Sequence, residues 1–182
     1  MEKREKHSKV IIIIFLAFFI WASLQFISPL LLPAKSVNDL SGIVVVSDND
    51  ITIDEMGFPH NVVYSIGDRL CHERAERSFF INGNQMPFCS RCTGIWVGLV
   101  IGISLMIFYT IKLDEKIFLL IVLSILPLGI DGAGQLIGFW ESTNLIRLIT
   151  GLLTGFGCGV AIGIIVDEFK AAFKETNMFK KV

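Results

Sequence analysis

A cluster of cysteine and histidine residues is the part of this chain best suited to chemistry. Cys71 and His72 are followed by Cys89 and Cys92, so three of the four cysteines lie within residues 71–92. Thiolate and imidazole groups are favoured zinc ligands. The Cys-x-x-Cys spacing also suits a redox-active thiol pair or a structural disulfide. The residue types therefore predict a site, and they leave three kinds of chemistry open.

The metal interpretation takes four ligands: Cys71, His72, Cys89 and Cys92. His60 is an alternative ligand in place of His72. Neighbouring side chains seldom point at one metal, so His60, a carboxylate or a water could replace His72. A position left open to water would allow catalysis. Zinc is the cofactor that this interpretation predicts, because it prefers tetrahedral sets of sulfur and nitrogen.

The redox and disulfide interpretations use the same cysteines. Cys89 and Cys92 lie at the start of an expected helix, where the helix dipole and Arg91 favour the thiolate. Cys71 could then act as a resolving thiol. A structural disulfide would pair two of the three and leave one over. Cys158 lies among glycines and apolar residues, so we expect it to be a small buried side chain outside the site.

The composition indicates an integral membrane protein. Of 182 residues, 53% are hydrophobic and only 18% are charged, and the mean hydropathy is +0.65. Soluble domains contain about 25% charged residues. The net charge of -1 supplies no basic excess for binding phosphates, which argues against nucleic acid as a partner. The expected partner is the lipid bilayer, and a homo-oligomer is compatible with the sequence.

Four apolar stretches are long enough to cross a bilayer, for which about 20 residues suffice. They cover residues 10–32, 94–111, 117–139 and 148–166. The first could be a signal peptide, but its apolar run is long for one, so an uncleaved anchor is expected. The predicted fold is an all-α integral membrane protein with four transmembrane helices and a long extracytoplasmic loop between the first two.

The distribution of Lys and Arg predicts the orientation. Ten basic residues, among them Lys3, Lys112 and Lys181, fall on one side of a four-span chain, whereas those of the loop are scattered. Both termini should therefore be cytoplasmic, in the plasma membrane. The expected segments are an N-terminal tail and first helix (1–33), the loop with the Cys/His segment (34–92), a three-helix core (93–166) and a cytoplasmic tail (167–182).

Two turns are expected inside the long loop. Branched residues at 43–46 and 51–53 flank an Asp/Asn-rich turn and predict a small β-hairpin. Asn82-Gly83 is a strong turn dipeptide after the strand-like residues 78–81. This second turn could fold the chain back so that Cys89 approaches Cys71.

Two apolar stretches carry glycines at every fourth residue. They are Gly94, Gly98 and Gly102 in the second, and Gly151, Gly155, Gly159 and Gly163 in the fourth. Residues four apart share a helix face. Small residues on one face let membrane helices pack closely. The glycines therefore predict a tight contact between these two helices.

Asp131 and Gln135 form a polar pair in the third stretch, near Pro127, where we expect the helix to be kinked or locally unwound. An ionisable residue inside a membrane needs a partner or a cavity. We expect Arg147 to be that partner, with Glu141 as a competitor. The candidate catalytic residues are Asp131, Glu141 and Arg147. The candidate substrate pocket consists of Gln135, Asn144, Arg77 and Arg91.

These short motifs together resemble a family of small prokaryotic multi-pass membrane proteins with a domain of unknown function. The motifs are Cys71-His72, Arg77-Ser78-Phe79, Cys89-x-Arg91-Cys92-Thr93-Gly94, Gly98, Asp131-Gly132, Gln135, Ser142-Thr143-Asn144, Arg147 and Thr150-Gly151. The resemblance covers about residues 70–163 and implies three core helices, with the first helix and the hairpin region as additions. It implies one constellation of the Cys/His segment with Asp131, Gln135 and Arg147, but no activity, cofactor or substrate.

The leading functional hypothesis is a metal-binding, zinc-type membrane protein that acts on a lipid-linked or small polar substrate at the outer leaflet. One alternative is a transporter or channel-like subunit that uses Asp131. Others are an extracytoplasmic thiol oxidoreductase that uses Cys89 and Cys92, and a scaffold without chemistry. The sequence does not decide whether the protein is an enzyme.

Overall fold

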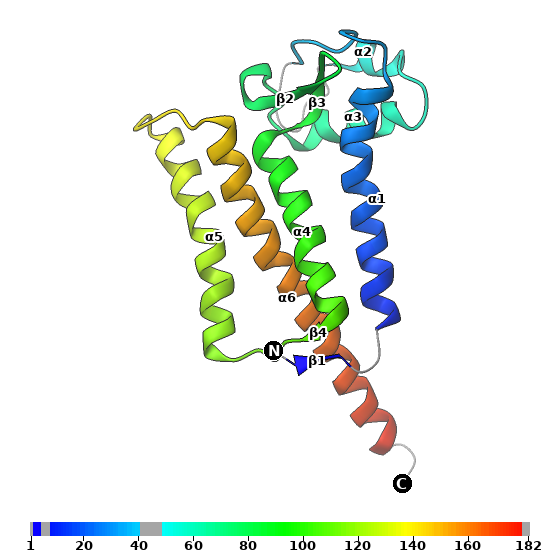
Figure 1. Ribbon diagram of the computed structural model, residues 1–182, viewed down its shortest axis with the longest axis vertical. Coiled ribbons are helices and arrows are strands. Elements are labelled where there is room, and N and C mark those ends of the chain that lie inside the picture. Colours follow the sequence, from blue (N-terminus) through cyan, green and yellow to red (C-terminus); the bar gives the residue numbers. More distant parts are fainter. Residues whose placement is uncertain (1, 5–7, 41–48, 180–182) are drawn as a thin grey trace.

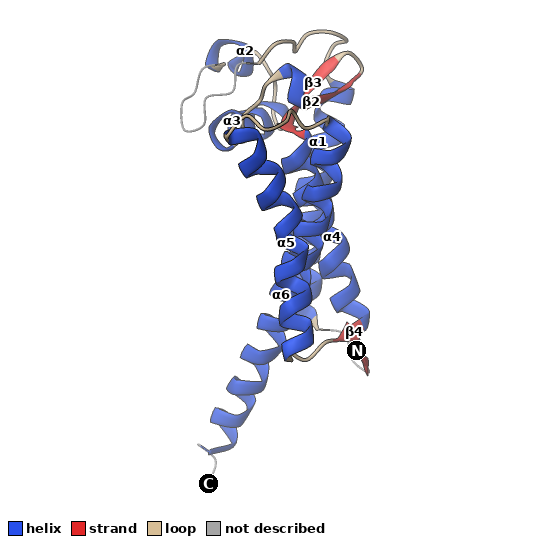
Figure 2. Cartoon of the chain, turned by 90° about the vertical axis from the view of Figure 1, so that its left-hand side faces the viewer, coloured by secondary structure: helices blue, strands red, loops and turns tan. Residues whose placement is uncertain are grey.

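A computed structural model describes residues 2–4, 8–40 and 49–179 of the chain (Figure 1). Four helices are long and apolar enough to cross a membrane. They are α1 (Lys9–Leu31), α4 (Ser90–Phe108), α5 (Glu115–Leu136) and α6 (Asn144–Phe179). The four predicted membrane helices are therefore confirmed, and α6 extends beyond its apolar part at the end with the C-terminus (Figure 2).

Short elements between α1 and α4 form a cap over one end of the helices (Figures 1 and 2). They are α2 (Asp50–Asp54), α3 (His60–Leu70), a 3-10 turn (Ala75–Arg77), β2 (Ser78–Ile81) and β3 (Asn84–Cys89). We call this end of the molecule the cap end. Buried apolar side chains hold the cap together, with Tyr64 of α3 and Ile53 of α2 packed in one cluster.

Strands β2 and β3 form the antiparallel hairpin expected at Asn82-Gly83. Both turn residues have positive φ, 56° at Asn82 and 73° at Gly83, as such a tight turn requires. Ser78 is thereby paired with Cys89. Because β3 leads directly into α4, the hairpin delivers Cys89 and Cys92 beneath the cap.

The other predicted hairpin is wrong where the structure describes it. Residues 51–53 lie in the helix α2, and residues 43–46 lie outside the described residues. A single helical turn places Ile53 and Met56 on the same side, and both are buried against the cap. Burial of that face replaces the strand pairing that the branched residues had suggested.

Helices α4 and α6 pack along their glycine faces, as predicted. A Cβ on Gly102 would lie 3.0 Å from the Cα of Gly159, and one on Gly94 would lie 3.2 Å from the Cα of Gly151. Backbone atoms thus meet where other residues would carry side chains. The result is a closely packed helix pair whose ends at the cap carry Cys92 and Arg147.

Helix α5 lies beside α6 and starts at a side-chain cap, where Asp114 accepts a hydrogen bond from the backbone N–H of Ile117 at 2.8 Å. The helix continues through Pro127 up to Leu136. The local unwinding expected near Pro127 is therefore not found. Asp131 and Gln135 remain on one face of a continuous helix.

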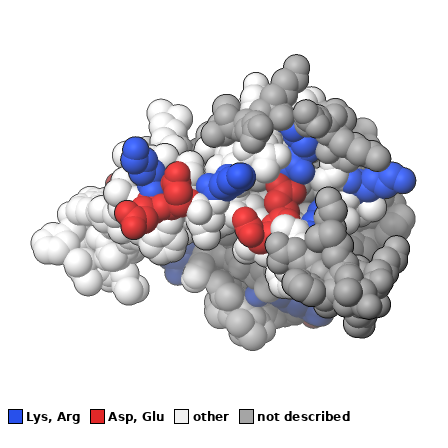
Figure 3. All heavy atoms as spheres, turned by 90° about the horizontal axis from the view of Figure 1, so that it is seen from below, with Lys and Arg blue, Asp and Glu red and all other residues white. Residues whose placement is uncertain are grey.

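The end opposite the cap holds both termini and the α4–α5 connection (Figure 1). There β1 (Glu2–Lys3) pairs with β4 (Tyr109–Thr110), and the Arg4 guanidinium donates to Asp167 at 2.9 Å. Basic and acidic side chains gather on this face (Figure 3). We call it the terminal end. These contacts tie the chain's start to α6.

Candidate functional site

Three cysteines from three different elements meet under the cap. Cys71 ends α3, Cys89 is the last residue of β3, and Cys92 lies in the first turn of α4. Their sulfur atoms all lie within 4.8 Å of one another, and those of Cys71 and Cys92 are 3.5 Å apart. The approach of Cys89 to Cys71, expected from the hairpin turn, is confirmed.

The hydrogen bonds around these sulfurs favour negative charge in the group. The backbone N–H of Cys89 donates to the sulfur of Cys71 at 3.2 Å. The contact with Cys71, then that with Cys92, lowers the pKa of the Cys89 thiol. The contact with Cys89 raises the pKa of Cys71 in turn. One shared thiolate with two thiol neighbours is the arrangement that a cation can bind in place of protons.

The structure does not bring the histidines into this group. Among the described residues, the three cysteines form the group with metal-ligand spacing, and neither His72 nor His60 belongs to it. His72 is exposed to solvent beside the buried Cys71, because adjacent residues of an extended segment point in opposite directions. Cys158 lies in the middle of α6, outside the group as expected, but it is half-buried rather than buried.

A chain of polar contacts joins α4, α5 and α6 at the cap end. Arg91, the residue before Cys92, forms an ion pair with Asp131. The Gln135 amide donates to Asp131 at 3.0 Å and accepts from Arg147 at 3.1 Å. Arg147 also donates to Asn144 at 3.1 Å. All five residues belong to the predicted catalytic or pocket set. Four of them lie on α5 and α6, and Arg91 connects them to the Cys-x-x-Cys turn.

The expected ion pair between Asp131 and Arg147 is wrong. Arg91 occupies the carboxylate of Asp131, and Gln135 stands between Asp131 and Arg147. Gln135 lies one turn nearer the cap than Asp131 does, so it meets Arg147 first. Glu141, the expected competitor, is exposed on the α5–α6 connection and forms no ion pair with Asp131 among the described residues.

A polar cavity of about 350 Å³ lies beside this chain of contacts. Its lining comes from the 3-10 turn and from the start of α6: Arg74, Glu76, Arg77, Glu141, Ser142 and Arg147. Asn144 connects the two sides, since its amide donates to the backbone oxygen of Ser78 at 3.3 Å. Arg77, Glu141 and Arg147 of the predicted site thus face one cavity. Arg91 is instead engaged with Asp131 below it.

Sequence reasoning missed Glu73 and Arg74. Glu73 is fully buried, neither carboxylate oxygen has a hydrogen-bond partner among the described residues, and burial raises its pKa to about 9. Arg74 lines the polar cavity. Both follow Cys71-His72 in a run of charged residues that resembled a solvated surface turn. Only the fold separates them, since Glu73 faces inward and Arg74 faces the cavity.

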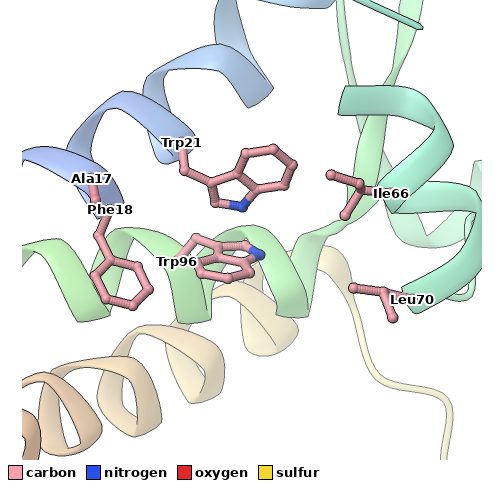
Figure 4. Close-up of a pocket in the computed structure, with 6 residues that line it drawn as sticks. All are labelled: Ala17, Phe18, Trp21, Ile66, Leu70 and Trp96. Carbon is pink, nitrogen blue, oxygen red and sulfur yellow. The ribbon is translucent and has the colours of Figure 1, made fainter. Parts of the chain in front are cut away.

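An apolar pocket of about 320 Å³ lies between α1, α3 and α4 (Figure 4). The indole rings of Trp21 on α1 and Trp96 on α4 meet edge to face at 5.9 Å, and Ile66 and Leu70 of α3 complete the pocket. Leu70 precedes Cys71, and Trp96 lies one turn after Cys92. The pocket is therefore an apolar neighbour of the site.

Comparison with known proteins shows which part of the chain matches a protein family. The family model described as "Predicted membrane protein (DUF2085)" matches residues 71–162. The match begins at Cys71 and includes α4, α5 and most of α6, whereas α1 and α3 precede it. This confirms the resemblance seen in the sequence.

Two archaeal relatives are similar to about half of the chain. An uncharacterized protein of Methanocaldococcus jannaschii is 40% identical over 98 residues, which are 52% of this chain and 62% of that protein. An uncharacterized protein of Methanothermobacter thermautotrophicus is 38% identical over 96 residues, which are 53% of this chain and 86% of that protein. No solved structure matches this chain.

Proposed function

The chain belongs to the DUF2085 family of predicted membrane proteins, and on this premise we propose that it is a zinc-binding membrane protein with an outward-facing polar pocket. The observation that carries the proposal is the meeting of Cys71, Cys89 and Cys92 within 4.8 Å. Zinc bound at about 2.3 Å from each sulfur holds such sulfurs somewhat less than 4 Å apart. The 3.5 Å between two of the sulfurs fits a metal centre after small side-chain adjustments.

Three thiolates leave the fourth position of a tetrahedral zinc open. A zinc ion with an open position activates water or polarises a carbonyl or phosphoryl oxygen. His72 and His60 stay outside the three-sulfur group, so we propose that an oxygen from water or substrate takes this position. Reactivity at the metal would then depend on the residues beside it.

The polar cavity supplies the other parts of the proposed site. Arg147 acts as an anion clamp, and Glu141, which faces the same cavity, is the acid–base candidate. Asp131 stays a candidate for this role, but its ion pair with Arg91 favours a positioning function. The proposed substrate is a lipid-linked or small polar molecule at the outer leaflet. The continuous course of α5 through Pro127 gives no support to the transporter alternative.

The placement in the membrane completes the proposal. We propose the plasma membrane as the location, with the cap end outside and both termini, including the tail 167–182, inside. The segment boundaries proposed from the sequence (1–33, 34–92, 93–166 and 167–182) then separate anchor, outer loop, core and inner tail. A homo-oligomer is compatible with this arrangement.

Elemental analysis of detergent-purified protein tests the metal site. We expect about one zinc per chain in the unaltered protein, as for a single three-thiolate site. Cys89→Ser combined with Cys92→Ser should abolish zinc binding, whereas the control Cys158→Ser should retain it. Asp131→Asn should also retain zinc, because Asp131 is not a ligand.

A free-thiol count under denaturing conditions without reductant distinguishes the main alternative. Four thiols in the metal-free chain agree with a zinc site. Absence of metal together with two missing thiols would contradict the zinc proposal. It would favour thiol exchange, for which the lowered pKa of Cys89 is the supporting observation.

A further inference from the structure

Arg147 carries a buried positive charge without an ionic partner. Arg147 is only 6% exposed, and its guanidinium donates hydrogen bonds to the neutral side-chain oxygens of Gln135 and Asn144. No carboxylate of the described residues forms an ion pair with Arg147, so none neutralises its charge directly. A buried charge that lacks a counter-charge is costly, and binding an anion offsets that cost.

The cavity beside Arg147 gathers further positive charge. Arg74 and Arg77 line it together with Arg147, against the two carboxylates of Glu76 and Glu141. Arg147 lies in the first turn of α6, where the helix dipole adds positive potential. Guanidinium groups offer forked donors that match phosphoryl and carboxylate oxygens. Three of them around about 350 Å³ suit a compact anion with several oxygens.

An apolar groove of about 490 Å³ has lining residues next in sequence to those of the cavity, since Ile146 precedes Arg147 and Trp140 precedes Glu141. It lies between α5 and α6 and is lined by Pro127, Ile130, Asp131, Trp140, Ile146 and Thr150. Asp131 is also joined to Arg147 through Gln135. The lining of the groove is therefore linked to the lining of the cavity through the Asp131–Gln135–Arg147 contacts, with apolar side chains around the groove and arginines around the cavity.

We propose that the cavity and the groove together bind one lipid with an anionic phosphoryl headgroup. The headgroup lies among Arg74, Arg77 and Arg147, and the hydrocarbon chain leaves through the α5–α6 groove into the bilayer. This inference rests on the proposed function, because it names the substrate class of the same polar pocket. A lipid fits better than a free anion, since the groove is apolar and lies between two helices that are long and apolar enough to cross a membrane.

Lipid binding to the purified, metal-containing protein in detergent tests the proposal. The probes are phosphatidic acid, phosphatidylcholine with the same acyl chains, and water-soluble glycerol 3-phosphate. We expect saturable binding of phosphatidic acid, at least about tenfold tighter than that of the other two. Equal binding of phosphatidylcholine would overturn the anionic headgroup. Equal binding of glycerol 3-phosphate would show a site for a free anion and overturn the lipid.

Variants locate the headgroup. Arg147→Gln should weaken binding of phosphatidic acid by about tenfold. Arg74→Glu, at an exposed position that is less critical for folding, should weaken it by about the same factor. Arg69→Glu is the matched control, since it changes the charge equally at the cap end but does not line the cavity. An equal loss with Arg69→Glu would mean nonspecific attraction and would overturn the site.

Two tryptophan substitutions locate the hydrocarbon chain. Ile146 is 48% exposed, so Ile146→Trp should fold and fill the groove, with a loss of about tenfold. Ala17→Trp is the control, because it fills the apolar pocket between α1 and α4. If only Ala17→Trp weakened lipid binding, the hydrocarbon chain would lie in the pocket between α1 and α4, and the proposed groove would be overturned. Zinc measured in the same samples separates the two proposals: zinc without lipid binding refutes this one, and lipid binding without zinc refutes the metal site.

Discussion

Asp131 takes part in a series of polar contacts that connects the single residues of this site. Its carboxylate pairs with Arg91 and accepts from Gln135, which in turn accepts from Arg147. Asp131→Asn should leave the partly buried Arg91 without its counter-charge, so we expect a loss of about 1–3 kcal/mol in stability and a lower midpoint of thermal unfolding in detergent. Glu141→Gln, at an exposed position, should leave the midpoint unchanged.

Retained zinc in Asp131→Asn would show that the folded cap persists. The interpretation of the ion pair would be contradicted if Arg91→Gln in the Asp131→Asn background lowered the midpoint as much again as it does alone. Coupled partners share one loss, whereas independent residues add their losses.

The sequence could not predict whether Arg91 or Arg147 is the partner of Asp131. Spacing correctly placed Asp131 and Gln135 on one face, because four residues make about one helical turn. It could not give the rotation of α4, which turns Arg91 toward α5. Nor could it show that Gln135 reaches Arg147 first. The site residues were recognisable by type, while their pairing depends on how three helices are oriented.

The contact between α4 and α6 determines the geometry of the site at the scale of elements. A Cβ on Gly98 or Gly155 would collide with backbone atoms of the opposite helix, which cannot rotate away. Gly98→Ala should therefore destabilise the protein by about 1–3 kcal/mol and displace Cys92 and Arg91 on the same helix. The measurement is the unfolding midpoint together with zinc content. Gly129→Ala is the control, because nothing lies within 4 Å of a Cβ there.

A midpoint equal to that of Gly129→Ala would contradict close packing of the two glycine faces. The regular spacing of these glycines made the contact between α4 and α6 predictable. The turn chemistry of Asn82-Gly83 made the β2–β3 hairpin predictable in the same way. Residues 51–53 behaved differently, because their branched side chains favour a strand only when a partner strand is present. In the cap, Ile53 gains more by burial against Tyr64 and its neighbours.

The whole molecule has its chemistry at one end and both termini at the other (Figure 1). The Arg4–Asp167 pair and the β1–β4 pairing join the N-terminal segment to α6 and to the α4–α5 connection. The excess of Lys and Arg near the terminal end predicts that this end is cytoplasmic. The cysteines, the cavity and the α5–α6 groove would then all face the outer leaflet.

Reporter fusions test this orientation. Alkaline phosphatase fused after Phe58, which follows α1 in the cap, should be active because it lies outside. The same enzyme fused after Val182 should be inactive, and a fluorescent protein fused there should fluoresce. Activities in the opposite sense would put the cysteines in the cytoplasm. An outer-leaflet lipid could then not be the substrate, although the zinc site and the arginine-lined cavity would stand, because their geometry does not depend on the side of the membrane.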